Sequence, residues 1–306
     1  MIPQKQSTLV TEYHYEGKGL HTGKVSHMTL KPAPENTGIL FHRTDLGENA
    51  FIKPLAEYIT STSRNTTITD GKVSVLTLEH LMSALTGMGV DNVLVELDNA
   101  EVPILDGSAR FYVEPLKRDG IRQQDAMREY IPLDKEIMVT DEKSGSWVKI
   151  TPSEEVSYDA TIDFGSNVLG IQEAHWDPSL DYATEIGYCR TFVFLHEVAY
   201  LFQNNLIKGG DVDNAIVIVE HPLPQEQFEQ LKAVFNHPNI SVNGNGYLNN
   251  LELHFPNECG RHKLLDLIGD VRLCGGFIKG KVSAFKPGHS INSMLTKAVR
   301  QYVQNK

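Results

Sequence analysis

Cysteine is scarce in this chain of 306 residues. Only Cys189, Cys259 and Cys274 occur, and no two of them form a C-x-x-C pair, which excludes a disulfide framework and a four-cysteine zinc site. No apolar run approaches the ~18 residues of a membrane-spanning helix, and residues 1–11 lack the charged and apolar regions of a secretory signal. We therefore expect a cytoplasmic protein with no membrane span.

Basic residues are also few. Lys and Arg number 28 against 39 Asp and Glu, a net charge of −11, which argues against nucleic acid held by a broad basic surface. The 41% hydrophobic and 22% charged fractions are ordinary for a globular protein. The length is typical of two domains with a substantial core.

The order of elements predicts two related α+β layers. Short apolar runs between Gly, Pro and Asn residues indicate strands in both halves, and helices follow the strands in each. Apolar residues at 78, 81, 82 and 85 predict a helix with Thr77 as its N-cap and Gly87 at its end. The charged stretch 117–129 reads as a linker, so we place an N-terminal domain at 1–125 and a C-terminal domain at 126–306.

One predicted helix carries ligand-type side chains on a single face. In the run RHKLLDLIGD at 261–270, His262, Asp266 and Asp270 fall within about 80° of one another at the helical period, and the leucines cover the other side. Such a face is more often simply solvated. Taken alone, the H-x-x-x-D spacing is a weak signal.

Glu79 and His80 open the earlier helix and strengthen the case for a metal. With His262 and Asp266, His80 completes a set of two histidines and one carboxylate, as catalytic zinc prefers, and Glu79 would be a base beside it. Spacing does not show that the two helices meet. Glu79 could instead just favour the positive end of its helix dipole.

His289 follows a Lys-Pro-Gly turn, where an imidazole could act as an acid, supported by Asp270. Simple solvation is the alternative. A structural metal site of Cys259, His262 and His254 is another, but it leaves Glu79 and His80 unexplained. The sequence contains no phosphate-binding loop, dinucleotide fingerprint or nucleophilic-serine elbow.

Several motifs, taken in order, resemble those of the UDP-3-O-acyl-N-acetylglucosamine deacetylases, zinc enzymes of lipid A synthesis. The motifs are GLHTG at 19–23, KPAPENTG at 31–38, TLEHL at 77–81, VPILDGS at 102–108, RTF at 190–192, GG at 209–210, RHKLLDLIGD at 261–270 and FKPGH at 285–289. They extend over almost the whole chain. The resemblance implies two two-layer α/β sandwich domains with the active site in the cleft between them.

The resemblance also implies roles for individual residues. His80, His262 and Asp266 would bind zinc, Glu79 would be the general base and His289 the general acid, with support from Asp270, Lys263 and the oxyanion contact Thr191. The nucleotide and sugar would meet His21, Asp163, Phe164, Phe192, Lys263 and Lys286. A fatty acyl chain would enter a passage at Val198, Ile207, Gly210, Ala215 and Val217. We expect a monomer that binds a UDP-sugar carrying this acyl chain.

The chain departs from the family pattern in two places, and two rival functions stay open. The segment 221–250 is longer than in the enterobacterial members, and Asp211 places a charge beside the passage, so the acyl length is left open. The ion could be zinc or ferrous iron. The rivals are a zinc amidohydrolase acting on another acylated amine and a non-catalytic module in which zinc is structural.

Overall fold

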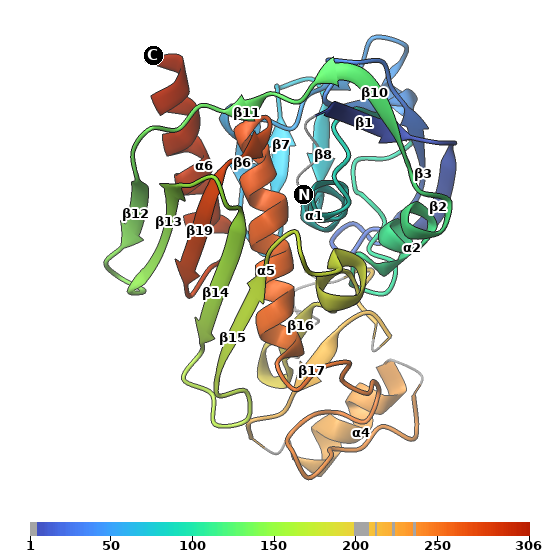
Figure 1. Cartoon of the computed structure of the whole chain (residues 1–306). Coiled ribbons are helices and arrows are strands. Elements are labelled where there is room, and N and C mark those ends of the chain that lie inside the picture. Colours follow the sequence, from blue (N-terminus) through green and yellow to red (C-terminus); the bar gives the residue numbers. More distant parts are fainter. Residues whose placement is uncertain (1–4, 199–207, 212, 222–223, 235–236) are drawn as a thin grey trace.

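Two five-stranded sheets organise the molecule (Figure 1). The computed structural model describes residues 5–198, 208–211, 213–221, 224–234 and 237–306. In spatial order the first sheet contains β2 (Tyr13–Lys18), β3 (Val25–Pro32), β9 (Val93–Leu97), β4 (Ile39–Arg43) and β5 (Phe51–Ile52). The second contains β12 (Ile137–Asp141), β13 (Ser146–Pro152), β19 (Gly280–Phe285), β14 (Ser157–Asp163) and β15 (Ile171–Trp176).

The two sheets share one topology. In each, only the pairing of the central strand with the first strand that follows the opening hairpin is parallel: β9 with β4 and β19 with β14. A helix precedes each central strand and another follows it: α1 (Glu79–Gly87) and α2 (Arg110–Asp119) in the first half, α5 (Glu258–Val271) and α6 (His289–Gln304) in the second. The predicted α+β fold of two related halves is therefore confirmed.

Each half has an insertion at the same point, between its fourth strand and the helix that precedes its central strand. In the first half it is a small sheet of β6 (Ile59–Ser61), β7 (Thr67–Thr69) and β8 (Ser74–Leu76). In the second it includes the parallel pair β16 (Phe192–Phe194) and β17 (Ile216–Ile218), and then α4 (Gln225–Val234). Both insertions lead directly into the helices that carry the predicted metal ligands.

Two further strand pairs lie outside the two main sheets. β1 (Lys5–Leu9) pairs with β10 (Ile121–Met127), and β11 (Tyr130–Ile131) pairs with β18 (Phe277–Ile278). Most of the segment 117–129, predicted as a linker, is thus the strand β10. Its side chains are largely polar and exposed because it belongs to a two-stranded sheet near the surface, which hides its strand pattern. The domain boundary at 125 stays a prediction.

The helices α1 and α5 pack backbone to backbone. A Cβ added to Gly269 of α5 would lie 2.1 Å from the carbonyl oxygen of Glu79 and 3.1 Å from the amide nitrogen of Ser83. The Ser83 hydroxyl donates across the contact to the Leu265 carbonyl at 2.6 Å. Leu81 of α1 and Leu264 of α5 are fully buried in one apolar core. Small residues at this contact let the equivalent helices of the two halves share one core.

The start of α1 differs from the expectation. Thr77 does not cap the helix, which begins at Glu79. Its backbone has a φ of 58°, in the left-handed region, and its hydroxyl donates to Glu101 Oε1 at 2.8 Å. The buried Glu101 carboxylate competes for the hydroxyl, so the chain turns sharply just before the helix.

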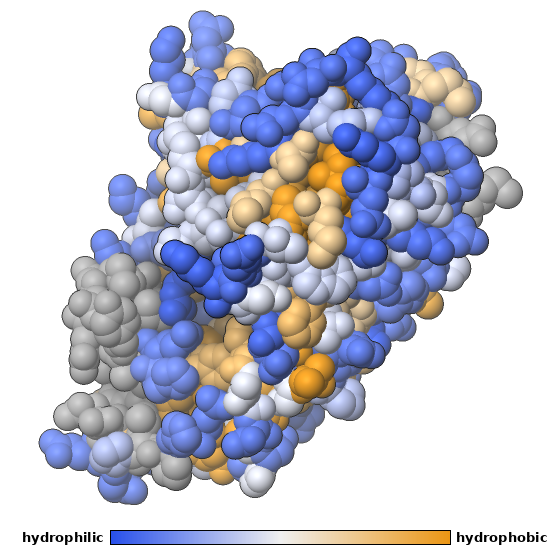
Figure 2. Space-filling view, turned by 90° about the vertical axis from the view of Figure 1, so that its left-hand side faces the viewer, coloured by the Kyte–Doolittle hydropathy of each residue, from blue (hydrophilic) through white to orange (hydrophobic). Residues whose placement is uncertain are grey.

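One side of the molecule is mostly hydrophilic, with apolar residues gathered in patches between the polar ones (Figure 2). No helix within the described residues is both long enough and apolar enough to cross a bilayer.

Candidate active site

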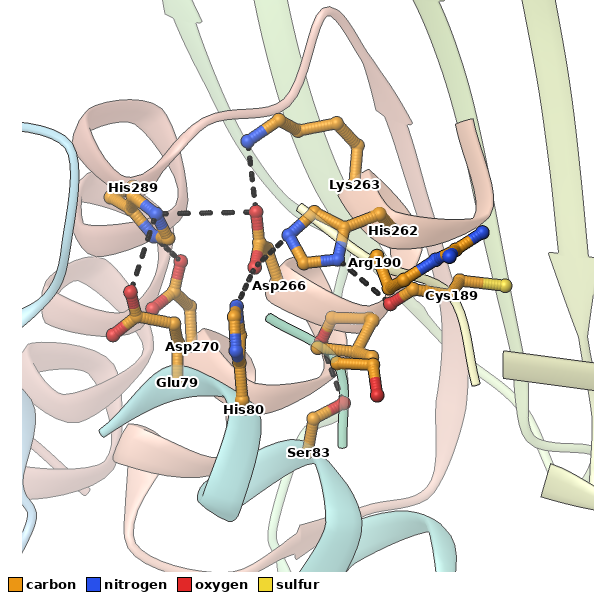
Figure 3. Close-up of polar contacts among 12 residues, drawn as sticks. Glu79, His80, Ser83, Cys189, Arg190, His262, Lys263, Asp266, Asp270 and His289 are labelled. Carbon is orange, nitrogen blue, oxygen red and sulfur yellow. Dashed lines mark hydrogen bonds and ion pairs between the residues drawn. The ribbon is translucent and has the colours of Figure 1, made fainter. Parts of the chain in front are cut away.

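Three ligand-type side chains converge where α1 meets α5 (Figure 3). His80 comes from the first turn of α1, and His262 and Asp266 lie one turn apart on α5. The Nε2 atoms of His80 and His262 lie 3.5 Å and 3.4 Å from the same oxygen, Oδ1 of Asp266. The ligand atoms all lie within 4.8 Å of one another, and all three residues are buried.

The protonation states of His262 and Asp266 favour the binding of a cation. Nδ1 of His262 donates to the Cys189 carbonyl at 3.0 Å, since a carbonyl oxygen only accepts, so the lone pair is left on Nε2. Burial lowers the pKa of His262 to about 3. Burial alone would raise the pKa of Asp266. Lys263, whose Nζ lies 2.8 Å away, and the neighbouring histidines together outweigh burial and hold that pKa well below its usual range.

The residues fit a divalent metal ion such as zinc. Asp266 Oδ1 is buried and accepts no hydrogen bond, although two imidazole nitrogens point towards it. A buried carboxylate oxygen without a partner is costly, and a shared cation would satisfy it. Among the described residues no other group of three or more His, Cys, Asp or Glu brings its ligand atoms this close, which argues against the alternative site of Cys259 and His254.

Glu79 and His289 stand beside the ligand group. Glu79 Oε1 lies 3.8 Å from His289 Nε2, and that nitrogen lies 4.0 Å from Asp266 Oδ2. On its other side, His289 Nδ1 lies 2.9 Å from Asp270 Oδ2. Asp270 thus meets Nδ1 and Glu79 faces Nε2, so the imidazole is held between two carboxylates (Figure 3).

Burial and the neighbouring carboxylates determine the protonation of Glu79 and His289. Burial raises the pKa of Glu79, which makes the carboxylate a stronger base. For His289, burial alone would disfavour the cation, but Asp270 and Glu79 outweigh it and raise the pKa to about 9. The pair can therefore offer one group that accepts a proton and one that donates a proton near neutral pH.

The ligand group lines a cavity of about 340 Å³. Its polar part is lined by His21, Glu79, His80, Thr191, His262, Lys263, Asp266 and His289. Its apolar part is lined by Phe164, Phe192, Phe194, Leu195, Val198, Ala215, Val217 and Leu248, with Gly210 and Asp211 nearby. Most of the site residues expected from the sequence thus line one space.

Three of the expected site residues lie outside the cavity lining. Asp270 lies against Nδ1 of His289, on the side that supports this imidazole. Asp163 and Lys286 also lie outside the lining and pair with each other at 3.2 Å between Nζ and Oδ2. Phe164, next to Asp163, packs edge-on against the Phe192 ring at 5.5 Å between ring centroids. Ile207 lies outside the described residues.

Some contributors to the site carry no recognisable signal in the sequence. Thr66 donates from its hydroxyl to Asp270 at 2.6 Å and from its amide to Glu79 at 3.1 Å, so it orients both carboxylates. It is one of several threonines in the insertion before α1. The Cys189 carbonyl, which fixes His262, is a backbone group that any residue could supply. The side-chain identity of neither position points to the site.

Comparison with known proteins identifies the family. The model of the LpxC family, described as UDP-3-O-acyl N-acetylglycosamine deacetylase, matches residues 6–238 and 232–301. The chain belongs to the LpxC family. The two matched pieces meet at 232–238, in the long segment between β17 and α5.

Curated LpxC relatives match nearly the whole chain. The UDP-3-O-acyl-N-acetylglucosamine deacetylase of Myxococcus xanthus is 40% identical over 96% of this chain and 86% of its own length. That of Acidithiobacillus ferrooxidans is 38% identical over 96% of this chain and 90% of its own length. The Bifunctional enzyme LpxC/FabZ of Porphyromonas gingivalis is 44% identical over 98% of this chain. The chain spans 65% of the length of that bifunctional relative.

Proposed function

We propose that this chain is a zinc-dependent deacetylase that hydrolyses the N-acetyl group of a UDP-3-O-acyl-N-acetylglucosamine and releases acetate, an early step of lipid A synthesis. The observation that carries the proposal is the convergence of His80, His262 and Asp266 beside Glu79 and His289 in one buried site. The names of the relatives supply the substrate class, and the apolar part of the cavity suits its acyl chain.

His80, His262 and Asp266 would hold the ion. A zinc ion so held would polarise the amide carbonyl and lower the pKa of water. The neutral imidazole of His262 and the ionised carboxylate of Asp266 are the protonation states that such an ion requires. Lys263 offsets part of the carboxylate charge and faces the cavity, where it can also meet a phosphate.

Glu79 and His289 would divide the proton transfers. Glu79 takes a proton from the attacking water, which its raised pKa favours. The amine of the sugar leaves poorly as an anion, so the His289 cation donates a proton to it, and Asp270 stabilises that cation. The Thr191 hydroxyl, in the same lining, would donate to the oxyanion, a contribution of about 3–4 kcal/mol for a well-placed donor.

Acetate release tests the proposal. The protein is expected to release acetate from a UDP-3-O-acyl-N-acetylglucosamine, to lose this activity when a chelator removes its metal, and to regain it with zinc or ferrous iron. UDP-N-acetylglucosamine without an acyl chain should react far more slowly, because it cannot use the apolar part of the cavity. Acetate release that survives complete loss of metal would contradict the proposal.

Single variants test the ligand set. His262→Ala is expected to lower metal affinity at least ~10-fold, since ligands and their supports typically contribute this much. His254→Ala is the matched control: its ring contacts Tyr188, with centroids 6.2 Å apart, and it belongs to the rival structural site. Metal content and affinity would be measured on both purified proteins. Equal metal loss in both variants would favour the structural site instead.

A further inference from the structure

The long segment between β17 and α5 contributes to the lining of the cavity. The family match breaks within this segment, at 232–238. In Figure 1, α4 and the chain around it form the lower end of the molecule, beyond β16 and β17. One residue of this segment, Leu248, lines the cavity.

Residues 246–248 act as a third strand beside β17. Ile218 and Tyr247 form an antiparallel bridge. On either side of it, the Val219 amide donates to the Gly246 carbonyl at 2.7 Å and the Leu248 amide donates to the Val217 carbonyl at 3.0 Å. The backbone of Leu248 is thus fixed by the same strand that supplies Val217 to the cavity.

The strand period then decides which side chain faces the cavity. Residues paired across an antiparallel ladder point to the same face, so Leu248 lies on the face of Val217, and Tyr247 lies on the opposite face with Ile218. The packing agrees. Val217 and Leu248 belong to one apolar cluster and both line the cavity, whereas Tyr247 and Ile218 belong to another cluster, with Cys259.

Buried apolar side chains outside the cavity lining pack in the same cluster as Leu248. Leu248 is only 2% exposed, and Ile240 is buried in the same cluster, with Phe228 of α4 packed against it. Leu195 and Val198 complete this cluster on the cavity side. A side chain held by both a ladder and a packed cluster resists displacement. Leu248 therefore forms part of a firmly packed apolar wall of the cavity.

We propose that Leu248 limits the length of the acyl chain that the cavity accepts. This inference rests on the proposed deacetylase function and concerns the substrate of that same site. An acyl chain that fits gains about fourfold in binding for each buried methylene. A chain too long by one or two methylenes must displace Leu248 and the cluster behind it, or leave its end outside the cavity.

Variants of Leu248 should shift the chain-length preference in opposite directions. Leu248→Ala is expected to raise kcat/KM for the longer of two substrates that differ by two methylenes, relative to the shorter, roughly 10-fold or more. Leu248→Phe is expected to shift the same ratio the other way. The measurement is acetate release from UDP-3-O-acyl-N-acetylglucosamines in two-carbon steps. The two variants are independent, so poor folding of one leaves the other as a test.

Val242→Ala is the matched control. Val242 bridges to Leu248 through the backbone, but its side chain is 45% exposed, so the variant should keep the wild-type preference. A change in kcat/KM by the same factor at every chain length in the Leu248 variants would overturn the inference and leave the deacetylase function intact. If the wild-type protein releases acetate from no UDP-sugar of any chain length, the proposed function itself fails.

Discussion

Glu79→Gln should retain its metal and lose turnover at least ~100-fold, because the amide cannot accept the proton that general base catalysis requires. The expected retention follows from the geometry. Glu79 is outside the group of His80, His262 and Asp266. The side-chain oxygen of glutamine can still accept the hydrogen bond that the Thr66 amide donates to Glu79 at 3.1 Å. The variant therefore changes the proton chemistry with little change in shape.

The measurements are metal content, thermal unfolding and the rate of acetate release. Glu114→Gln, on α2, makes the same chemical change at a carboxylate that pairs with Arg110 outside the cavity, and it should keep nearly full activity. Normal turnover in Glu79→Gln would refute its role as base. If Glu79→Gln loses its metal as well as its turnover, Glu79 would instead help to hold the ion. If the protein is a non-catalytic module with structural zinc, neither the wild type nor the variant will release acetate.

How much of the site the sequence predicts depends on the distance between its parts along the chain. The spacing of His262 and Asp266 places both on one face of a helix, and α5 has that geometry. Glu79 and His80 lie about 180 residues earlier. No local rule brings them to α5. The resemblance to a known family suggested the meeting, and the structure shows the two helices in contact.

The relation between the two halves, expected from the order of their elements, is clearest in the strand order of the two sheets. Each half follows the same path through its sheet, with equivalent helices before and after the central strand. The residues differ because each position adapts to its own neighbours, so the sequence shows no exact repeat. The ligands then have a simple origin in the fold: His80 lies on the first helix of one half, and His262 and Asp266 lie on the equivalent helix of the other.

Local rules failed where buried polar groups outweigh them. Thr77 has the residue type and position of an N-cap, but its hydroxyl serves the buried Glu101 carboxylate, which also accepts from the His21 and Thr22 amides. The strand β10 has a polar, linker-like sequence, but it is fixed by pairing with β1. In both cases the deciding partner lies far away in the sequence, where propensity and periodicity carry no information.

Gly269→Ala should destabilise the protein and disrupt the site, although alanine is the better helix former. Helix propensity alone would favour the substitution by up to about 1 kcal/mol. Against this, the new Cβ would lie 2.1 Å from the Glu79 carbonyl oxygen, a backbone atom that moves only if α1 moves. Overpacking of this kind costs about 1–3 kcal/mol, occasionally more. We therefore expect a net loss of stability, seen as a lower Tm.

The effect on activity should exceed the effect on stability. Glu79 and His80 belong to α1, and His262 and Asp266 belong to α5. A shift of one helix away from the other would therefore separate His80 from the other two ligands and Glu79 from the ion. A displacement of about 1 Å can reduce turnover ~100-fold. Gly244→Ala is the control, since its added Cβ meets no atom within 4 Å and its φ is not positive. Unchanged metal affinity and turnover in a folded Gly269→Ala protein would show that the site does not depend on the close approach of α1 and α5.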